Sequence, residues 1–183
     1  MRRHDHPRVC GLLTRLAVRT SNARSATGRL HAGAVVLKCA LGRAGVRRTK
    51  REGDGATPAG AFALLSLSFR ADRNRALRCR LPRRAIRPGD GWCDDPISPV
   101  YNRPVRLPVR AGAEEMWRAD ELYDIVVVLD YNLAPRRKGT GSAIFFHCAR
   151  PDFAPTAGCV AISPGDMRRL LPRLSRRVVM DIR

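Results

Sequence analysis

A histidine and a cysteine in the C-terminal part of the chain have the types and spacing of a thiol acyl-transfer site. His147 ends an apolar run that starts at Ala143, and Cys159 follows it by twelve positions, directly after Gly158. A thiol attacks as the thiolate, and a nearby imidazole can take its proton. A glycine before the thiol lets a carbonyl approach backbone N–H groups that stabilise an oxyanion. We therefore predict Cys159 as nucleophile, His147 as general base, and the N–H groups of Gly158 and Cys159 as oxyanion donors.

Structural interpretations of both residues stay open at this point. Cys159 can be a buried apolar thiol, and a histidine that ends an apolar strand often serves packing. His147 is nevertheless the only histidine in the C-terminal two thirds of the chain, so a catalytic Cys159 would have it as its partner. A metal site at His147, Cys148 and Cys159 lacks a normal ligand set, so we predict neither metal nor organic cofactor.

The residues around Cys159 resemble the YkuD-type L,D-transpeptidases of bacterial cell walls. That family carries a strand histidine, a loop, and then Ser/Thr-His-Gly-Cys followed by a hydrophobic residue and Asn or Arg. The matching residues are His147, Thr156, Gly158, Cys159 and Val160. Ala157 stands where the second histidine is usual, Ala161 stands where Asn or Arg is usual, and the loop is shorter than usual.

A second stretch, residues 50–62, looks like the Gly-rich Thr-Pro-x-Gly-x-Phe turn that opens a strand of the same catalytic domain. The resemblance spans roughly residues 12–183. It implies a mainly β (α+β), β-sandwich-like domain with a few short helices. It also implies that a peptidoglycan stem peptide is the donor, held as a thioester on Cys159 and passed to an amine.

Four further residues are expected to bind substrate, and one to shape the catalytic loop. Arg150 lies between His147 and Cys159 and can pair with a carboxylate of the substrate. Trp92, Tyr101 and Asn102 lie in the long irregular region 70–108, where they are expected to line the cleft. The Thr156 hydroxyl is expected to bond within the loop that carries the thiol.

Two other functions remain open. Transfer of the acyl group to water would make the chain a carboxypeptidase or amidase of wall peptides. The net charge of +19, from 35 basic and 16 acidic residues, also suits a non-catalytic module that binds an anionic wall polymer. Specific nucleic-acid binding is not expected, because aromatic residues make up 5% of the chain and no known motif occurs.

The resemblance implies a location in the cell envelope or periplasm. No signal peptide is readable, because the apolar run at 9–14 is stopped by Arg15, so a cytoplasmic location stays open. No apolar stretch is long enough for a transmembrane segment. The six cysteines show no regular spacing and predict neither a zinc framework nor a dense disulfide scaffold.

The chain is expected to form one domain over residues 10–183 after a flexible basic tail at 1–9. Short apolar runs predict strands at 12–19, 30–41, 61–69, 125–129, 143–147, 159–162 and 178–182. A short helix is expected at 114–121. A second helix is expected after Ser163, with Ser163 as N-cap and Pro164 at the first helical position.

Overall fold

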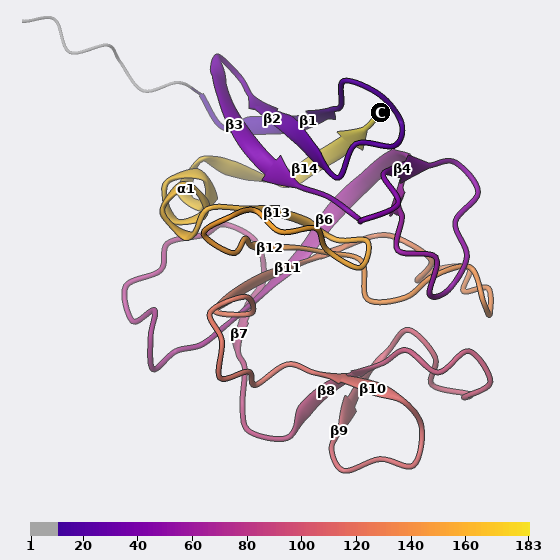
Figure 1. Cartoon of the computed structure of the whole chain (residues 1–183). Helices are drawn as coiled ribbons and strands as arrows, with labels where there is room; N and C mark the ends of the chain where they lie inside the picture. Colours follow the sequence, from indigo (N-terminus) through magenta and orange to yellow (C-terminus); the bar gives the residue numbers. More distant parts are fainter. Residues whose placement is uncertain (1–10) are drawn as a thin grey trace, which may run out of the picture.

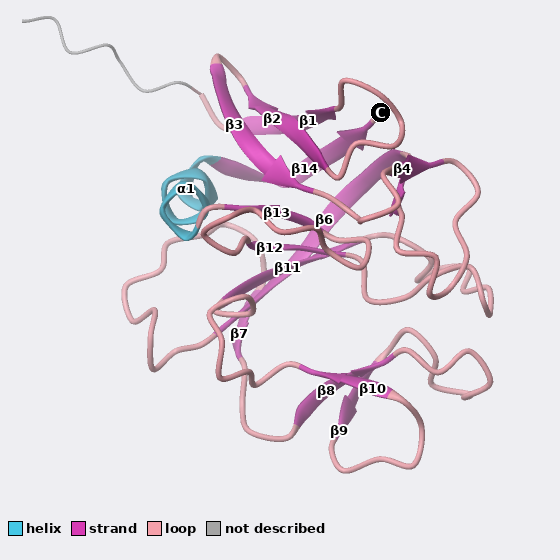
Figure 2. Ribbon diagram, viewed as in Figure 1, coloured by secondary structure: helices cyan, strands magenta, loops and turns pink. Residues whose placement is uncertain are grey.

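The computed structural model describes residues 11–183, and the tail predicted at 1–9 lies outside the described residues. The mainly β prediction is confirmed, because strands make up most of the regular structure and the helices are short (Figure 2). The strands are β1 Leu13–Arg19, β2 Thr27–Ala32, β3 Val35–Ala40, β4 Val46–Arg47, β5 Thr57–Pro58, β6 Gly60–Phe69, β7 Arg83–Ala85, β8 Asp90–Cys93, β9 Pro104–Arg106, β10 Ala113–Glu115, β11 Ile125–Leu129, β12 Phe145–Cys148, β13 Val160–Ile162 and β14 Leu174–Ile182.

The main sheet closes on itself. Hydrogen bonds join nine strands in the order β11-β12-β13-β3-β2-β1-β14-β6-β7, and β6 also pairs with β11. In Figure 1, strands β1, β2, β3 and β14 form one layer over β6, β11, β12 and β13. The two layers face each other across an apolar interior, which is the sandwich-like arrangement that the resemblance implied.

Successive side chains along the central strands point to opposite faces of the sheet, and each face contributes to a different apolar cluster. On β11, Ile125, Val127 and Leu129 point into the closed sheet and join its main core. Val126 and Val128 point to the opposite face and join a smaller cluster outside the sheet. The strand predicted at 125–129 therefore has both faces buried, which explains why it is continuously apolar.

A small three-stranded sheet, in the order β10-β8-β9, is formed by residues that the sequence assigned to loop or helix. The helix expected at 114–121 is wrong, because Ala113–Glu115 pairs with β8 and places Glu114 opposite Trp92. Tertiary pairing here overrides the local helix preference of this segment. The single strand expected at 30–41 is also wrong: Gly33, at φ +67°, makes a turn that divides it into β2 and β3.

The predicted helix start is confirmed. Helix α1 spans Pro164–Leu170, and the 3-10 helix η1, Leu171–Arg173, follows it directly. The Ser163 hydroxyl accepts a hydrogen bond from the Asp166 N–H at 3.1 Å, as an N-cap does. Within residues 11–183, no helix has the length and apolar character needed to cross a bilayer.

Buried Asp181 ties β14 to the parallel strand β1. It is 4% exposed, and its Oδ2 accepts hydrogen bonds from Arg15 at 2.6 Å and from Arg19 at 2.8 Å. Arg183 adds a contact of 3.2 Å to Oδ1. These guanidinium groups, Arg15 first, hold the pKa of Asp181 down at about 2.

We expect Asp181→Asn to lower the free energy of unfolding by about 1–2 kcal/mol at pH 7, because the partners are charged but partly exposed. A carboxyl pKa lowered by folding stabilises the protein above the unfolded-state pKa near 4. That contribution is lost as the pH falls from about 4 through 2. Urea unfolding at several pH values measures both effects.

The exposed Glu121→Gln is the matched control and should leave the unfolding midpoint unchanged. Equal midpoints for the Asp181→Asn variant and the wild type at pH 7 would contradict the role of Asp181.

Candidate active site

His147 lies on the outer face of the closed sheet. Along β12, Phe146 and Cys148 point into the main core, while Phe145 packs in the outer cluster. Strand alternation therefore sends His147 to the same side as Phe145. His147 is 5% exposed, and the ring of Tyr123 packs edge-on against it with centroids 5.3 Å apart.

Cys159 is brought to the same face by the parallel pairing of β12 with β13. Phe146 is paired with Val160 and His147 with Ala161, so Cys159, one residue before Val160, comes beside Phe145. Its side chain is thus a diagonal neighbour of His147 on one surface. Within the described part of the chain, the thiol donates to Ala143 O at 3.2 Å and accepts from the Phe145 N–H at 3.3 Å, with no direct hydrogen bond to the imidazole.

Both groups are held in their neutral forms. Burial raises the pKa of the Cys159 thiol to about 12, with the Glu114 charge adding to the effect. Burial lowers the pKa of His147 to about 4, against the opposite influence of the Cys148 and Leu122 carbonyls. At neutral pH the pair therefore rests as thiol and imidazole rather than as an ion pair.

A backbone carbonyl orients the imidazole. His147 Nδ1 lies 2.8 Å from Cys148 O, so the tautomer that satisfies this contact carries its proton on Nδ1 and leaves the Nε2 lone pair available. This is the part that a third group plays beside a catalytic base. The sequence could not identify it, because every residue has a carbonyl.

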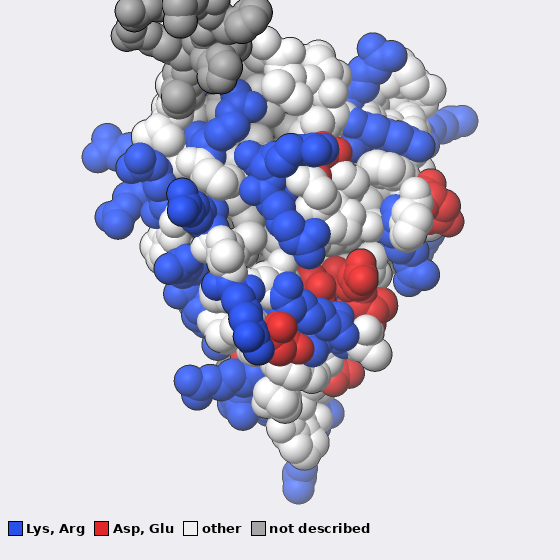
Figure 3. Space-filling model, turned by 90° about the vertical axis from the view of Figure 1, so that its left-hand side faces the viewer, with Lys and Arg blue, Asp and Glu red and all other residues white. Residues whose placement is uncertain are grey.

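Cys159 and His147 line one cavity of about 440 Å³. Arg150 lines it too, as do Thr156, Ala157 and Gly158 of the catalytic loop. The cavity also has charged or polar residues that the sequence did not single out: Arg43, Lys50, Glu52, Asp94, Glu114, Arg118, Tyr123 and Ser142. On the molecular face shown in Figure 3, Lys and Arg side chains predominate, and most of the visible Asp and Glu side chains lie in the centre and to the right.

The catalytic loop is closed by Thr156 and packed against the Gly-rich turn. The Thr156 hydroxyl donates to Cys159 O at 2.7 Å and accepts from the Gly158 N–H at 3.2 Å. The Gly158 N–H, predicted as an oxyanion donor, is therefore already engaged. Gly158 has φ +149°, and a Cβ there would lie 2.8 Å from Ala56 O, so no larger residue fits without moving the loop. The two stretches that carried the family resemblance thus meet at Gly158.

Trp92, Tyr101 and Asn102 lie behind the cavity wall and do not line it. Asn102 Oδ1 accepts from Trp92 Nε1 at 2.8 Å and from the Ala143 N–H at 3.1 Å. Ala143 is the residue whose carbonyl holds the thiol. The Tyr101 hydroxyl donates to Glu52, whose carboxylate also accepts from Ser142 at 2.7 Å. Their burial favours a supporting role over contact with substrate.

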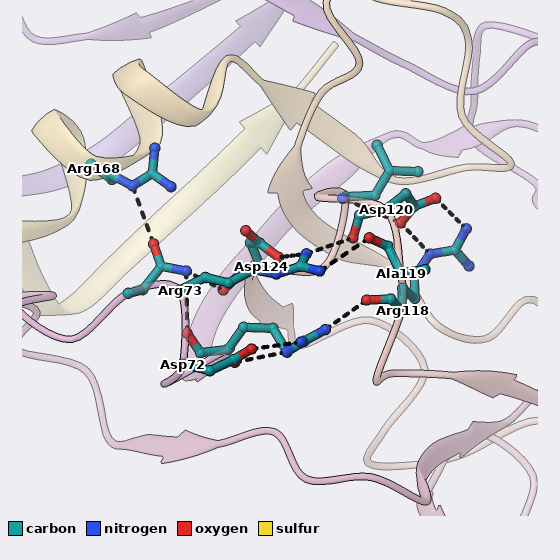
Figure 4. A network of polar contacts seen from close by, with 10 residues as sticks. Asp72, Arg73, Arg118, Ala119, Asp120, Asp124 and Arg168 are labelled. Atoms are coloured by element: carbon teal, nitrogen blue, oxygen red, sulfur yellow. Dashed lines mark hydrogen bonds and ion pairs between the residues drawn. The ribbon is translucent and has the colours of Figure 1, made fainter.

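A polar network fixes the segment that covers His147 (Figure 4). Arg73 donates to the Asp124 carboxylate at 2.8 Å and to Ala119 O at 3.1 Å. Arg70 donates to Arg118 O at 2.6 Å. Residues 118–124 are thereby attached to the segment after β6, and they carry the Tyr123 ring that packs on the imidazole.

Comparison with known proteins shows the family of the chain. The family model of the L,D-transpeptidase catalytic domain (YkuD) matches residues 15–181, and the chain belongs to this family. Among solved structures, it is similar to that of Mycobacterium tuberculosis L,D-transpeptidase 1, at 10% identity and a TM-score of 0.39. The match covers 94% of this chain and 61% of that one, so the chain spans about three fifths of its length. None of the curated proteins matches the chain.

The raised thiol pKa has a measurable consequence. With a pKa of about 12, the rate of Cys159 alkylation by iodoacetamide should rise about tenfold per pH unit between pH 7 and 10, without a plateau. The rate is followed by mass spectrometry of the peptide that contains Cys159, with Cys159→Ala as the blank. A rate that levels off above a midpoint at or below pH 8.5 would show instead that the Cys159 thiolate is stabilised before any substrate binds.

Asn102 is expected to stabilise the fold around the thiol. Asn102→Ala leaves the buried Trp92 and Ala143 donors without their acceptor and puts alanine at φ +53°. We expect a loss of at least about 2 kcal/mol of unfolding free energy. Thermal and urea unfolding measure it. Asn22→Ala is the matched control at an exposed turn and should change stability little; equal losses in the two variants would contradict the argument.

Proposed function

We propose that this chain is a thiol acyltransferase that acts on peptidoglycan stem peptides, with Cys159 as nucleophile and His147 as general base. The observation that supports this most is their common position: both side chains lie on one face of adjacent strands and line one cavity. Membership of the L,D-transpeptidase catalytic domain family supports the substrate class.

Because Cys159 and His147 are both neutral before substrate binds, the thiol proton must be transferred during the attack on the substrate. When a peptide carbonyl reaches Cys159, the thiol proton moves to His147, the sulfur–carbon bond forms, and the carbonyl electron pair moves onto oxygen. Collapse of this intermediate breaks the carbon–nitrogen bond, and His147 returns the proton to the leaving amine. The acceptor amine then attacks the thioester carbonyl, and His147 takes one proton from its nitrogen. The carbon–sulfur bond breaks, and His147 gives that proton to the departing Cys159 sulfur, which restores the thiol and the neutral imidazole.

Arg150 is the residue that we propose for substrate positioning. It lies on the loop between the base and the nucleophile and lines the cavity. Its guanidinium can form two parallel hydrogen bonds to a carboxylate, which suits the free carboxyl groups of a stem peptide.

The test is intact-mass spectrometry after incubation with a stem tetrapeptide, and separately with a carbapenem, whose strained amide acylates thiols. The wild type should gain the mass of the acyl group, while Cys159→Ala should gain none. Cys79→Ala removes a thiol outside the cavity and should behave like the wild type. His147→Asn should slow acylation by roughly a hundredfold or more, because general-base catalysis contributes about that much.

Product analysis then identifies the acceptor. With an acceptor peptide present, a cross-linked dimer supports transfer, and a shortened peptide alone means hydrolysis. Absence of any adduct under all conditions would contradict the enzyme proposal and favour a basic binding module.

A further inference from the structure

A buried lysine borders the loop that carries the nucleophile. Lys50 stands at the start of the Gly-rich turn, its side chain is 3% exposed, and it lines the same cavity as Cys159. An ammonium group removed from water is costly unless it is paired. A buried lysine therefore needs a local partner for its charge, and its position beside the cavity suggests a functional role.

Local contacts fix the position of the ammonium. Lys50 Nζ donates to Asp54 Oδ1 at 2.7 Å and to Arg51 O at 3.3 Å. The methylene groups of the Lys50 side chain pass over Gly141. A Cβ at Gly141 would lie 2.7 Å from Lys50 Cε, so a larger residue there would collide with the lysine side chain. An ammonium has three N–H groups. Among the described residues two acceptors are in reach, which leaves one N–H for a ligand.

The ammonium lies beside the backbone that immediately precedes the thiol. A Cβ built on Gly158 would lie 3.5 Å from Lys50 Nζ, so the cation is adjacent to the Gly158–Cys159 backbone. Of the two backbone donors predicted here, the Cys159 N–H remains, while other groups of the loop are engaged or absent. The Gly158 N–H bonds to Thr156, and Ala157 has no polar side chain.

We propose that Lys50 is a further catalytic residue, whose ammonium stabilises the negative charge of the acylation step. This inference rests on the proposed function. As the Cys159 proton moves to His147 and the sulfur–carbon bond forms, the carbonyl oxygen becomes an oxyanion, and the free Lys50 N–H donates to it. Lys50 keeps its proton throughout, and the charge disperses when the carbon–nitrogen bond breaks.

The charges around the two groups favour this role. Near Cys159, the Lys50 charge lowers the thiol pKa and the Glu114 charge raises it, while His147 and Tyr123 are neutral. Near Lys50 the acids are Asp54 and Glu52.

Both acids are engaged in other bonds. Asp54 also accepts two backbone N–H groups, from Arg51 and Ala56, each at 2.9 Å. Glu52 accepts from Tyr101 and Ser142. Their negative charge is thus shared among several donors.

The experiment compares acylation rates and alkylation profiles of the full-length chain. Lys50→Met keeps the length of the side chain and removes its charge. It should slow acylation by the carbapenem roughly a hundredfold, as loss of an oxyanion donor does. It should also lower the Cys159 alkylation rate at each pH from 7 to 10. Lys50→Arg should recover part of the acylation rate. Lys138→Met, at an exposed lysine, is the matched control and should equal the wild type.

A second variant separates chemistry from folding. Lys50→Met leaves Asp54 without its cation, so Lys50→Met/Asp54→Asn is made to remove both charges together. A folded double variant should show the same loss of acylation, and acylation within threefold of the wild type would overturn the proposal. If the wild type forms no adduct, the proposed function fails. The alkylation profiles then still decide: identical profiles for wild type and Lys50→Met overturn the role of Lys50.

Discussion

The two-residue alternation of β12 is the constraint on which the rest of the structure depends. Phe146 and Cys148 complete the interior of the closed sheet, and this obliges Phe145 and His147 to face outward. A shift of one residue would turn the imidazole into the main core and move Phe146 and Cys148 to the outer face. One register therefore fixes both the packing of the sheet and the direction of the His147 side chain, the proposed base. The parallel pairing of β13 adds Cys159 to the same surface.

An imidazole on the outer face of the sheet would be exposed to water unless other residues covered it. Here the segment that carries Tyr123 covers it. Tyr123 packs on His147, and the segment that carries it is attached by Arg73 and Arg70. Burial then makes the charged forms of imidazole and thiol unfavourable. In the proposed reaction, proton transfer from the thiol to the imidazole therefore becomes favourable only when a bound carbonyl can receive the electron pair from sulfur.

Sequence patterns predicted the strands with the clearest apolar runs, such as 61–69 and 125–129, and the N-cap at Ser163. They failed where a single glycine divides a run, as at Gly33, and where pairing with a distant strand overrides a local preference, as at 113–115. The His–Cys pair could be proposed from the sequence because its spacing is local, and the structure places both residues on one cavity. The proposed contribution of Lys50 could not, since nothing along the chain distinguishes one of 35 basic residues from another until the turn folds against Gly158.

The two departures from the family pattern, Ala157 and Ala161, leave the site with fewer polar side chains. Ala161 is fully buried beside Ala40 and Ala149, and it lines the cavity that contains Cys159. A site that loses polar side chains from its own loop needs charge from another element if it is to stabilise an oxyanion. The Gly-rich turn is that element, because its contact with Gly158 brings Lys50 to the loop. In this proposal, two segments separated by about a hundred residues act together on the charge that develops at the substrate carbonyl.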